Sequence, residues 1–180
     1  MQITGGFLNS RKIKFIASDS VRPTLSKTRQ AFFNSLNSLI DFEGKIFLDM
    51  FSGSGIMALE AVSRGFEEVY AIEKDKRNAR VILENFKAFK LEPNVFIGDS
   101  IKIASKLGKK FDVIFIDPPY DSDLYDKALD IIKSKGMLKA NGIIVLEHPI
   151  GKNIDFKEFE CIKEKEYADK KITFLSEKSD

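Results

Sequence analysis

The stretch Lys45–Gly55, with the sequence KIFLDMFSGSG, decides the fold of this chain. Its first residues form an apolar run that predicts a short buried strand, and Asp49 follows that run directly. Gly53 and Gly55 lack a Cβ, so the backbone after the strand can turn with positive φ and present its N–H groups to a ligand. A helical pattern then begins near Ile56. A strand, a glycine loop and a helix in this order predict the first unit of an α/β sheet.

The rest of the chain repeats this alternation, which predicts a doubly wound parallel sheet with right-handed crossovers. Near the carboxyl terminus, Glu158–Tyr167 and Lys171–Glu177 alternate in polarity around Ala-Asp-Lys and predict a closing antiparallel hairpin. The expected parallel strands lie near residues 46–49, 68–73, 94–97, 111–116 and 142–147, and the expected helices near 56–64, 75–90, 100–107 and 122–135.

The first forty residues differ from the rest in charge. They hold six basic residues and one acidic residue, a net charge of +5, whereas the whole chain carries +2, so residues 41–180 carry −3. A segregated basic segment favours contact with a phosphate backbone, because each neutralised phosphate releases counterions. We therefore expect a basic extension, residues 1–40, that contacts a phosphate backbone, followed by a separate domain, residues 41–180. The alternative is a solvated surface without a partner.

This extension should hold two elements ahead of the sheet. Residues 2–16 alternate enough in polarity to predict a hairpin around Asn9 and Ser10. Residues 24–40 predict a helix, because apolar residues recur on one face at helical spacing. The residues expected on that face are Leu25, Phe32, Leu36 and Leu39.

A second informative stretch is Asp117-Pro118-Pro119-Tyr120, which follows the apolar run Phe111–Ile116. The two prolines cannot continue a hydrogen-bonded ladder, so the strand should end there with Asp117 and the neighbouring carbonyls held in set directions. A fixed carboxylate beside an aromatic ring is suited to hold a planar base by its exocyclic amine. The alternative is that these residues only terminate a strand.

Two more acidic residues follow other expected strands. Glu73 ends the second strand, where its carboxylate can accept hydrogen bonds from ribose hydroxyls. Asp99 follows the third strand and can accept a hydrogen bond from an adenine amino group, although it could equally cap the next helix. Because the carboxyl ends of parallel strands meet at one rim, Asp49, Glu73, Asp99 and Asp117 should line one pocket.

The glycine loop also satisfies the fingerprint of dinucleotide-binding folds, since Gly53-Ser-Gly55-Ile-Met-Ala58 is followed by Glu73 at about the expected distance. In this chain, however, Asp49 and three further residues precede the first glycine, and a carboxylate there would repel a pyrophosphate. It would suit the ammonium of an amino-acid-bearing cofactor, and S-adenosylmethionine carries both an ammonium and a sulfonium. We therefore favour S-adenosylmethionine over NAD.

Together these residues resemble the class I methyltransferases, and more narrowly the bacterial small-subunit ribosomal RNA guanine-N2 methyltransferases. The glycine loop, Glu73, Asp99 and Asp117-Pro-Pro-Tyr120 resemble the class in order and spacing. The resemblance covers nearly the whole chain. Its narrower part rests on amino-terminal segments, namely Ile3-Thr-Gly-Gly6, Arg11-Lys12, Arg22-Pro-Thr24, Arg29 and Phe33-Asn34.

The resemblance implies a seven-stranded class I methyltransferase sheet and methyl transfer from S-adenosylmethionine to the N2 amine of a guanine in small-subunit (16S) ribosomal RNA. The implied partner is ribosomal RNA or the small ribosomal subunit. The implied catalytic residues are Asp117, Pro118, Pro119 and Tyr120. The implied cofactor-binding residues are Asp49, Phe51, Ser52, Gly53, Ser54, Gly55, Glu73, Asp99 and Ser100. The implied RNA-binding residues are Arg11, Lys12, Arg22, Thr24 and Arg29.

The acid at position 117 bears on the choice of base. Guanine presents its N2 amine beside N1–H, two donors side by side, whereas adenine presents its amine beside an acceptor. A carboxylate suits the donor-only face, so Asp117 favours guanine, and Tyr120 should stack on a base that is unpaired or flipped out. The alternatives are a DNA adenine-N6 methyltransferase and a non-catalytic ribosome-assembly protein that binds RNA.

Other features limit the remaining classes of protein. No apolar run approaches the roughly 20 residues that span a bilayer, and the amino terminus lacks the apolar core of a signal peptide, so we expect a cytoplasmic protein without a membrane partner. Cys161 and His148 are the single cysteine and histidine, which leaves no pair for a disulfide or a His/Cys metal site. We expect both to be structural, no bound metal, and a monomer.

Overall fold

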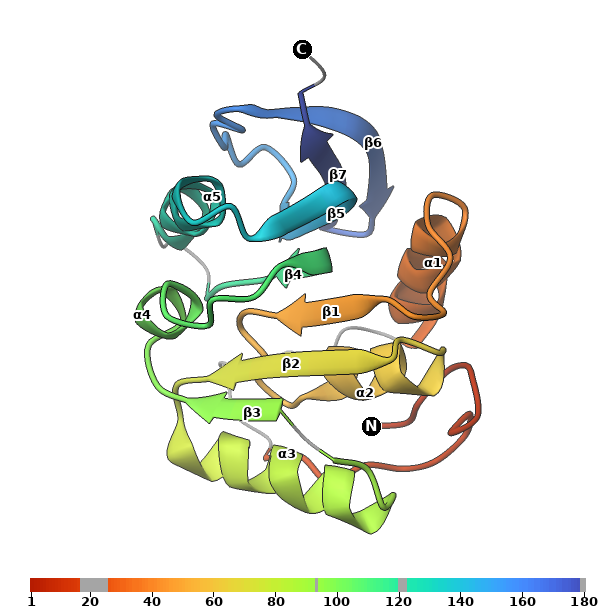
Figure 1. Ribbon diagram of the computed structural model, residues 1–180. Helices are drawn as coiled ribbons and strands as arrows, with labels where there is room; N and C mark the ends of the chain where they lie inside the picture. The colour runs from red at the N-terminus through yellow and green to blue at the C-terminus, as the bar shows by residue number, and fades with distance from the viewer. Residues whose placement is uncertain (17–25, 93, 120–122, 179–180) are drawn as a thin grey trace.

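The computed structural model describes residues 1–16, 26–92, 94–119 and 123–178. Its centre is a seven-stranded sheet in the order β3-β2-β1-β4-β5-β7-β6 (Figure 1). Strands β1 to β5 pair in parallel, whereas β7 runs antiparallel between β5 and β6. The strands are β1 (Ile46–Asp49), β2 (Glu68–Glu73), β3 (Asn94–Ile97), β4 (Phe111–Ile116), β5 (Leu138–Pro149), β6 (Phe159–Tyr167) and β7 (Lys170–Glu177).

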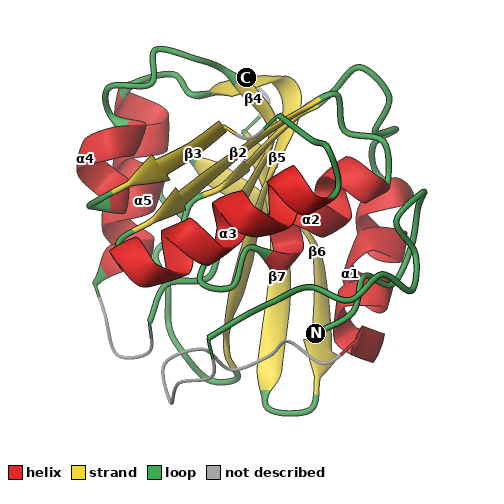
Figure 2. Cartoon of the chain, turned by 90° about the horizontal axis from the view of Figure 1, so that it is seen from below, coloured by secondary structure: helices red, strands yellow, loops and turns green. Residues whose placement is uncertain are grey.

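Helices cover both faces of this sheet and form a three-layered α/β/α domain (Figure 2). On one face lie α1 (Ser26–Asn37), α2 (Ile56–Ser63) and α3 (Lys76–Ala88). On the other face lie α4 (Ser100–Ala104) and α5 (Leu124–Ser134). No helix in the described ranges is both long enough and apolar enough to cross a membrane.

The buried strands supply side chains to both layers of core, because successive residues of a strand point to opposite faces. In β1, Phe47 packs under α1 to α3 and Leu48 packs under α4 and α5. In β4, Phe115 and Ile116 divide in the same way. Burial on both faces explains why these strands are continuous apolar runs in the sequence rather than alternating ones.

The predicted alternation of strands and helices is confirmed, and so is the closing hairpin, which forms β6 and β7. Four of the five predicted parallel strands agree with the structure in position, but β5 begins four residues earlier and ends two residues later than expected. His148 is buried in β5 and hydrogen-bonds Thr173 of β7 through Nε2 at 3.0 Å, which is a structural role.

Two predictions for the amino-terminal extension need correction. Residues 1–3 and 10–13 pair in a short antiparallel hairpin with a single bridge, between Gln2 and Lys12, and its turn spans residues 4–9 rather than centring on Asn9 and Ser10. Beyond this pairing, Lys14 binds Asn85 of α3. The predicted helix is α1, but it ends at Asn37, so Leu39 lies beyond it and is 38% exposed. Phe33, which was not among the residues expected on that face, is also buried, and Leu25 lies outside the described residues.

The extension is attached to the sheet through a buried ionic cluster on α2. Glu60 is fully buried and pairs with Arg29 of α1 and with Arg64. Its Oε1 also accepts hydrogen bonds from the backbone N–H and the hydroxyl of Thr4, at 2.7 and 2.8 Å. Gly6 has φ +74°, and a Cβ there would lie 1.6 Å from the Ser63 carbonyl oxygen, so only glycine fits. The Thr-Gly-Gly motif therefore docks residues 1–16 onto α2.

Candidate active site

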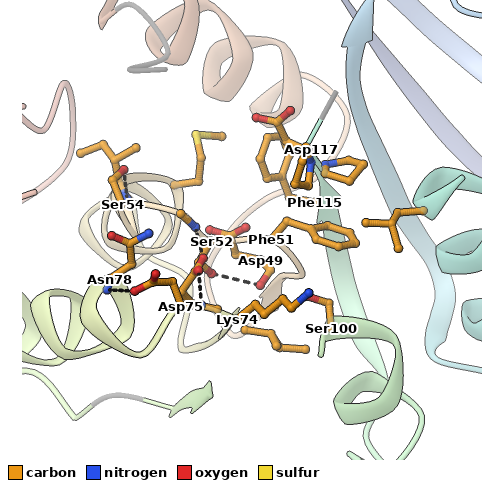
Figure 3. A pocket seen from close by; sticks show the side chains of 18 of the residues that line it. Asp49, Phe51, Ser52, Ser54, Lys74, Asp75, Asn78, Ser100, Phe115 and Asp117 are labelled. Atoms are coloured by element: carbon orange, nitrogen blue, oxygen red, sulfur yellow. Dashed lines mark hydrogen bonds between the residues drawn. The ribbon is translucent and has the colours of Figure 1, made fainter. Parts of the chain in front are cut away.

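Acidic side chains gather at the carboxyl ends of four parallel strands, as the doubly wound topology requires. Asp49 ends β1, Glu73 ends β2, Asp99 follows β3 and Asp117 follows β4. All four line one cavity of about 680 Å³. Figure 3 shows Asp49 and Asp117 in this cavity, with Phe51, Ser52 and Ser54 of the glycine loop beside them.

The glycine loop is fixed by hydrogen bonds to the neighbouring strand ends. Met50 N–H donates to the Phe115 carbonyl of β4 at 3.0 Å, and Ser52 N–H donates to the Ile72 carbonyl of β2 at 2.9 Å. Gly55 has φ +76°, and a Cβ there would lie 2.7 Å from Cγ1 of Ile82 on α3. The loop therefore passes close against α3 before α2 begins, which explains the need for glycine at position 55.

Asp49 is the least satisfied polar group in the cavity wall. Its side chain is buried, and neither carboxylate oxygen has a hydrogen bond from any residue within the described ranges. Burial raises the pKa of Asp49 from 3.8 to about 7; the nearby Ser52 hydroxyl opposes this shift and the Glu73 carboxylate adds to it. A buried carboxylate without donors is costly, so the site suits a cationic ligand group that supplies N–H donors.

Glu73 and Asp99 both hold local structure as well as facing the cavity. Glu73 accepts hydrogen bonds from the N–H groups of Gly53 at 2.7 Å and Asp75 at 2.8 Å, and burial raises the pKa of its carboxyl group. Asp99 caps α4, since its Oδ1 accepts a hydrogen bond from Lys102 N–H at 2.9 Å. The capping interpretation of Asp99 is confirmed, and the contact with an adenine amino group stays a prediction, for which the second carboxylate oxygen leaves acceptor capacity.

The Asp-Pro-Pro stretch forms the other end of the cavity. Asp117 is half-buried there, and Pro118 and Pro119 line the same wall. Burial, and then the Glu147 carboxylate of β5, raise the pKa of Asp117 well above its ordinary value, while Lys170 of β7 opposes this shift. Tyr120, predicted to stack on the base, lies outside the described residues.

The residues predicted to bind RNA separate into three groups. Arg11 and Lys12 are exposed, and the Arg11 guanidinium lies over the Phe89 ring at 5.5 Å. Arg22 and Thr24 lie outside the described residues. Arg29 is 1% exposed and pairs with Glu60 in the core, so its prediction as an RNA contact is replaced by a structural role.

Comparison with known proteins identifies the family. The family model described as Conserved hypothetical protein 95 matches residues 1–176. The chain belongs to this family. "Putative rRNA methyltransferase YlbH" of Bacillus subtilis is 33% identical over 153 residues, which covers 82% of each chain. "Ribosomal RNA small subunit methyltransferase D" of Buchnera aphidicola is 31% identical over 151 residues, covering 81% of this chain and 76% of the relative.

A solved structure confirms the fold of this member of the Conserved hypothetical protein 95 family. The yhhF protein from Escherichia coli aligns with a TM-score of 0.87 and 23% identity, covering 100% of this chain and 99% of that one. The resemblance to class I methyltransferases, and to those of small-subunit ribosomal RNA, is confirmed with it. In the described part of the chain, no group of three or more His, Cys, Asp or Glu side chains is placed to hold a metal ion.

Several residues that line the cavity were not predicted from the sequence. The glycine loop and its acidic neighbours line it as expected, except for Gly55, which is not among the lining residues. Phe115 could have been found from its place two residues before Asp117 on the same face of β4. Lys170 could not, because only the antiparallel pairing of β7 with β5 brings it to this rim. The other unpredicted residues include Ile16, Met57, Lys74, Asp75, Asn78 and Leu124.

Proposed function

We propose that this protein transfers a methyl group from S-adenosylmethionine to the exocyclic N2 amine of a guanine in small-subunit ribosomal RNA. The observation that carries the proposal is that one cavity is lined both by the glycine loop with Asp49 and by Asp117-Pro118-Pro119. Relatives named as small-subunit ribosomal RNA methyltransferases support the class of substrate.

The residues at the loop end fit the cofactor. The unsatisfied carboxylate of Asp49 would accept N–H donors from the ammonium group, directly or through water. Glu73, already fixed by two backbone N–H groups, would accept the ribose hydroxyls. Asp99 would accept the adenine amino group while it caps α4, and Phe51 and Ser100 would close the surrounding wall.

The Asp-Pro-Pro end would hold the base and its amine. S-adenosylmethionine would supply an electrophilic methyl group on its sulfonium, so the N–C bond would form as the C–S bond breaks, S-adenosylhomocysteine would leave, and the amine would lose one proton. Asp117 would accept N–H bonds from the amine, which favours a pyramidal and more nucleophilic nitrogen. Its raised pKa makes it a better proton acceptor than an ordinary Asp. Rigid placement by two prolines would contribute much of the rate through alignment.

The exposed basic side chains of the extension would contact the RNA backbone. The side chain of Asn85 on α3 holds residues 1–16 through the backbone of Lys14. Its Oδ1 accepts a hydrogen bond from Lys14 N–H at 2.9 Å, and its Nδ2 donates to the Lys14 carbonyl oxygen at 2.8 Å. The segment then reaches Ile16, which lines the cavity. Arg11 and Lys12 therefore lie on a path that leads to the proposed site of chemistry, as phosphate contacts that position a substrate would.

The test measures methyl transfer from labelled S-adenosylmethionine to unmodified small ribosomal subunits, naked ribosomal RNA and DNA. Each is assayed with the wild-type protein, with D117A, and with D155A as a matched exposed-carboxylate control. We expect label as N2-methylguanine in ribosomal RNA, lost in D117A and retained in D155A. D117N should shift methylation activity from guanine toward adenine, because the amide of Asn offers an N–H donor to the N1 acceptor of adenine.

The other outcomes assign a different function. Label that enters DNA alone would contradict the proposal and indicate a DNA adenine methyltransferase. Cofactor binding without transfer to any of the three substrates would contradict catalysis on them and favour an RNA-binding assembly protein. Label in ribosomal RNA at an atom other than guanine N2 would leave the cofactor assignment and overturn the assignment of the target.

A further inference from the structure

A row of charged residues crosses the rim of the sheet beyond Asp117. Phe115 of β4 is in register with Val145 of β5, so Glu147 of β5 and Asp117, which directly follows β4, lie at the same level of the rim, and the Glu147 carboxylate contributes to the raised pKa of Asp117. Glu147 is in register with Ile172 of β7, and Lys170 lies two residues from Ile172 on the same face of β7. The row therefore continues from the acid of β4, through β5, to a lysine on β7.

The lysine in this row is held in place rather than free in solvent. Lys170 Nζ donates to Oε1 of Glu147, and the two side chains are only 15% and 2% exposed. Glu147 lies inside the protein, whereas Lys170 itself lines the cavity together with Asp117. An ammonium carries three N–H donors, so it can bind this buried carboxylate and still present a donor to a ligand.

The spacing of the two residues suits a purine edge. Neighbouring strands lie about 4.8 Å apart, so β4 and β7, on either side of β5, place Asp117 and Lys170 roughly 10 Å apart across the sheet. A lysine side chain and the edge of one base can fill that distance. The cavity thus offers an acceptor, Asp117, and a donor, Lys170, from either side of β5.

We infer that Lys170 determines base specificity, by donating a hydrogen bond to O6 of the guanine whose N1–H and N2 amine are held by Asp117. This inference rests on the proposed function and extends it. Guanine presents O6, N1–H and N2–H₂ along one edge, a sequence of one acceptor and two donors. Adenine has its N6 amine at the position of O6, so two N–H donors, the amine and the Lys170 ammonium, would face each other without an acceptor. Glu147 acts as the positioning residue that fixes the ammonium.

The test compares guanine with 6-thioguanine, which keeps N1–H and the N2 amine but replaces O6 by sulfur, a weaker acceptor. Small-subunit RNA transcribed with a mixture of the two bases is methylated in one reaction, and mass spectrometry of the nucleosides gives the ratio of kcat/KM values directly. We expect the wild-type protein to favour guanine by about tenfold, the size of one hydrogen bond to a charged group.

The informative variant is the double change E147Q/K170M, because K170M alone would leave a buried carboxylate without its ammonium. We expect the double variant to methylate the two bases with a ratio near one, while S-adenosylhomocysteine binding and the melting temperature report that its fold and cofactor site persist. K170R, which keeps a donor, should retain a preference for guanine. K171M is the matched control and should keep the wild-type ratio, since Lys171 pairs with Glu164 and Glu166 and does not line the cavity.

Two results would overturn the inference. Equal rates on both bases in the wild-type protein would show that O6 is not recognised, and this result requires no variant. The wild-type preference persisting unchanged in E147Q/K170M would show that another group reads O6. Absence of N2 methylation by the wild-type protein on either base would instead refute the proposed function, on which the inference depends.

Discussion

Replacement of Asp49 by Asn is expected to stabilise the ligand-free protein at high pH while it weakens cofactor binding. Asp49 is an acid whose pKa in the folded state, about 7, exceeds its ordinary value of 3.8. Folding therefore opposes its ionisation, so ionisation favours the unfolded chain. This penalty is absent below pH 4, grows between pH 4 and pH 7 as the unfolded chain ionises, and is complete above pH 7.

The size of the effect follows from the same pKa values. Each unit of pKa difference corresponds to about 1.4 kcal/mol, so the penalty at pH 8 is roughly 4 kcal/mol. The substituted amide is itself a buried group without partners, at a cost of about 1 to 3 kcal/mol, which leaves a net gain of about 2 kcal/mol. For a chain of this length, that gain raises the melting temperature by about 4 to 8 °C.

The assay is thermal unfolding of wild-type and D49N protein from pH 4 to pH 8, together with calorimetric titration of S-adenosylhomocysteine. The difference in melting temperature should grow with pH, and the affinity should fall at least about tenfold because a charge-assisted hydrogen bond is lost. D112N is the matched control, since Asp112 accepts from Ile46 N–H and Lys139, and its replacement should lower stability at pH 8. A D49N gain that stays constant with pH, or is absent at pH 8, would refute the reasoning.

Three further predictions concern positions other than Asp49 and Asp112. G55A should lower the free energy of unfolding, measured in urea, by about 3 kcal/mol, because the new side chain is strained at positive φ and clashes with α3. In the control G108A the Cβ would meet no atom within 4 Å, so the loss should be about 1 kcal/mol. Equal losses in the two variants would contradict the clash. E60A should lower the melting temperature sharply, by the equivalent of about 3 to 5 kcal/mol, because it removes the carboxylate that Arg29 pairs with inside the core; a change within error would argue that the pair is dispensable. R11A should reduce RNA affinity alike for all sequences, and lower the slope of log affinity against log salt by about 1, without a change in unfolding; an unchanged slope would exclude a phosphate contact.

The strand pattern could be predicted because fully buried parallel strands are continuous apolar runs, and the acids that end them are adjacent in sequence to those runs. The predicted meeting of Asp49, Glu73, Asp99 and Asp117 required only one further rule, that parallel strands share a carboxyl rim. That the Asp49 carboxylate accepts no hydrogen bond in the described structure, in contrast, depends on which groups pack around it. The sequence shows that a carboxylate is present, but not whether N–H or O–H donors lie beside it.

Arg29 illustrates the opposite limit of sequence reasoning. A basic residue in a basic segment was expected to bind RNA, but its guanidinium is buried against Glu60, which lies more than thirty residues away in the chain. Charge patterning assumes that charged side chains face solvent, and only packing can show that one of them neutralises a buried partner.

The sequence by itself determined the order of elements, the glycine loop and the Asp-Pro-Pro terminus, because those properties arise from the local backbone preferences and polarity of neighbouring residues. The tertiary structure alone placed Lys170 beside the cavity and joined Glu60 to Arg29 and Thr4. These contacts link residues far apart in the chain, and their formation depends on strand register and helix packing. No local preference encodes the distance between two such side chains, so Lys170, the group proposed to read O6 of the base, became visible only in the folded sheet.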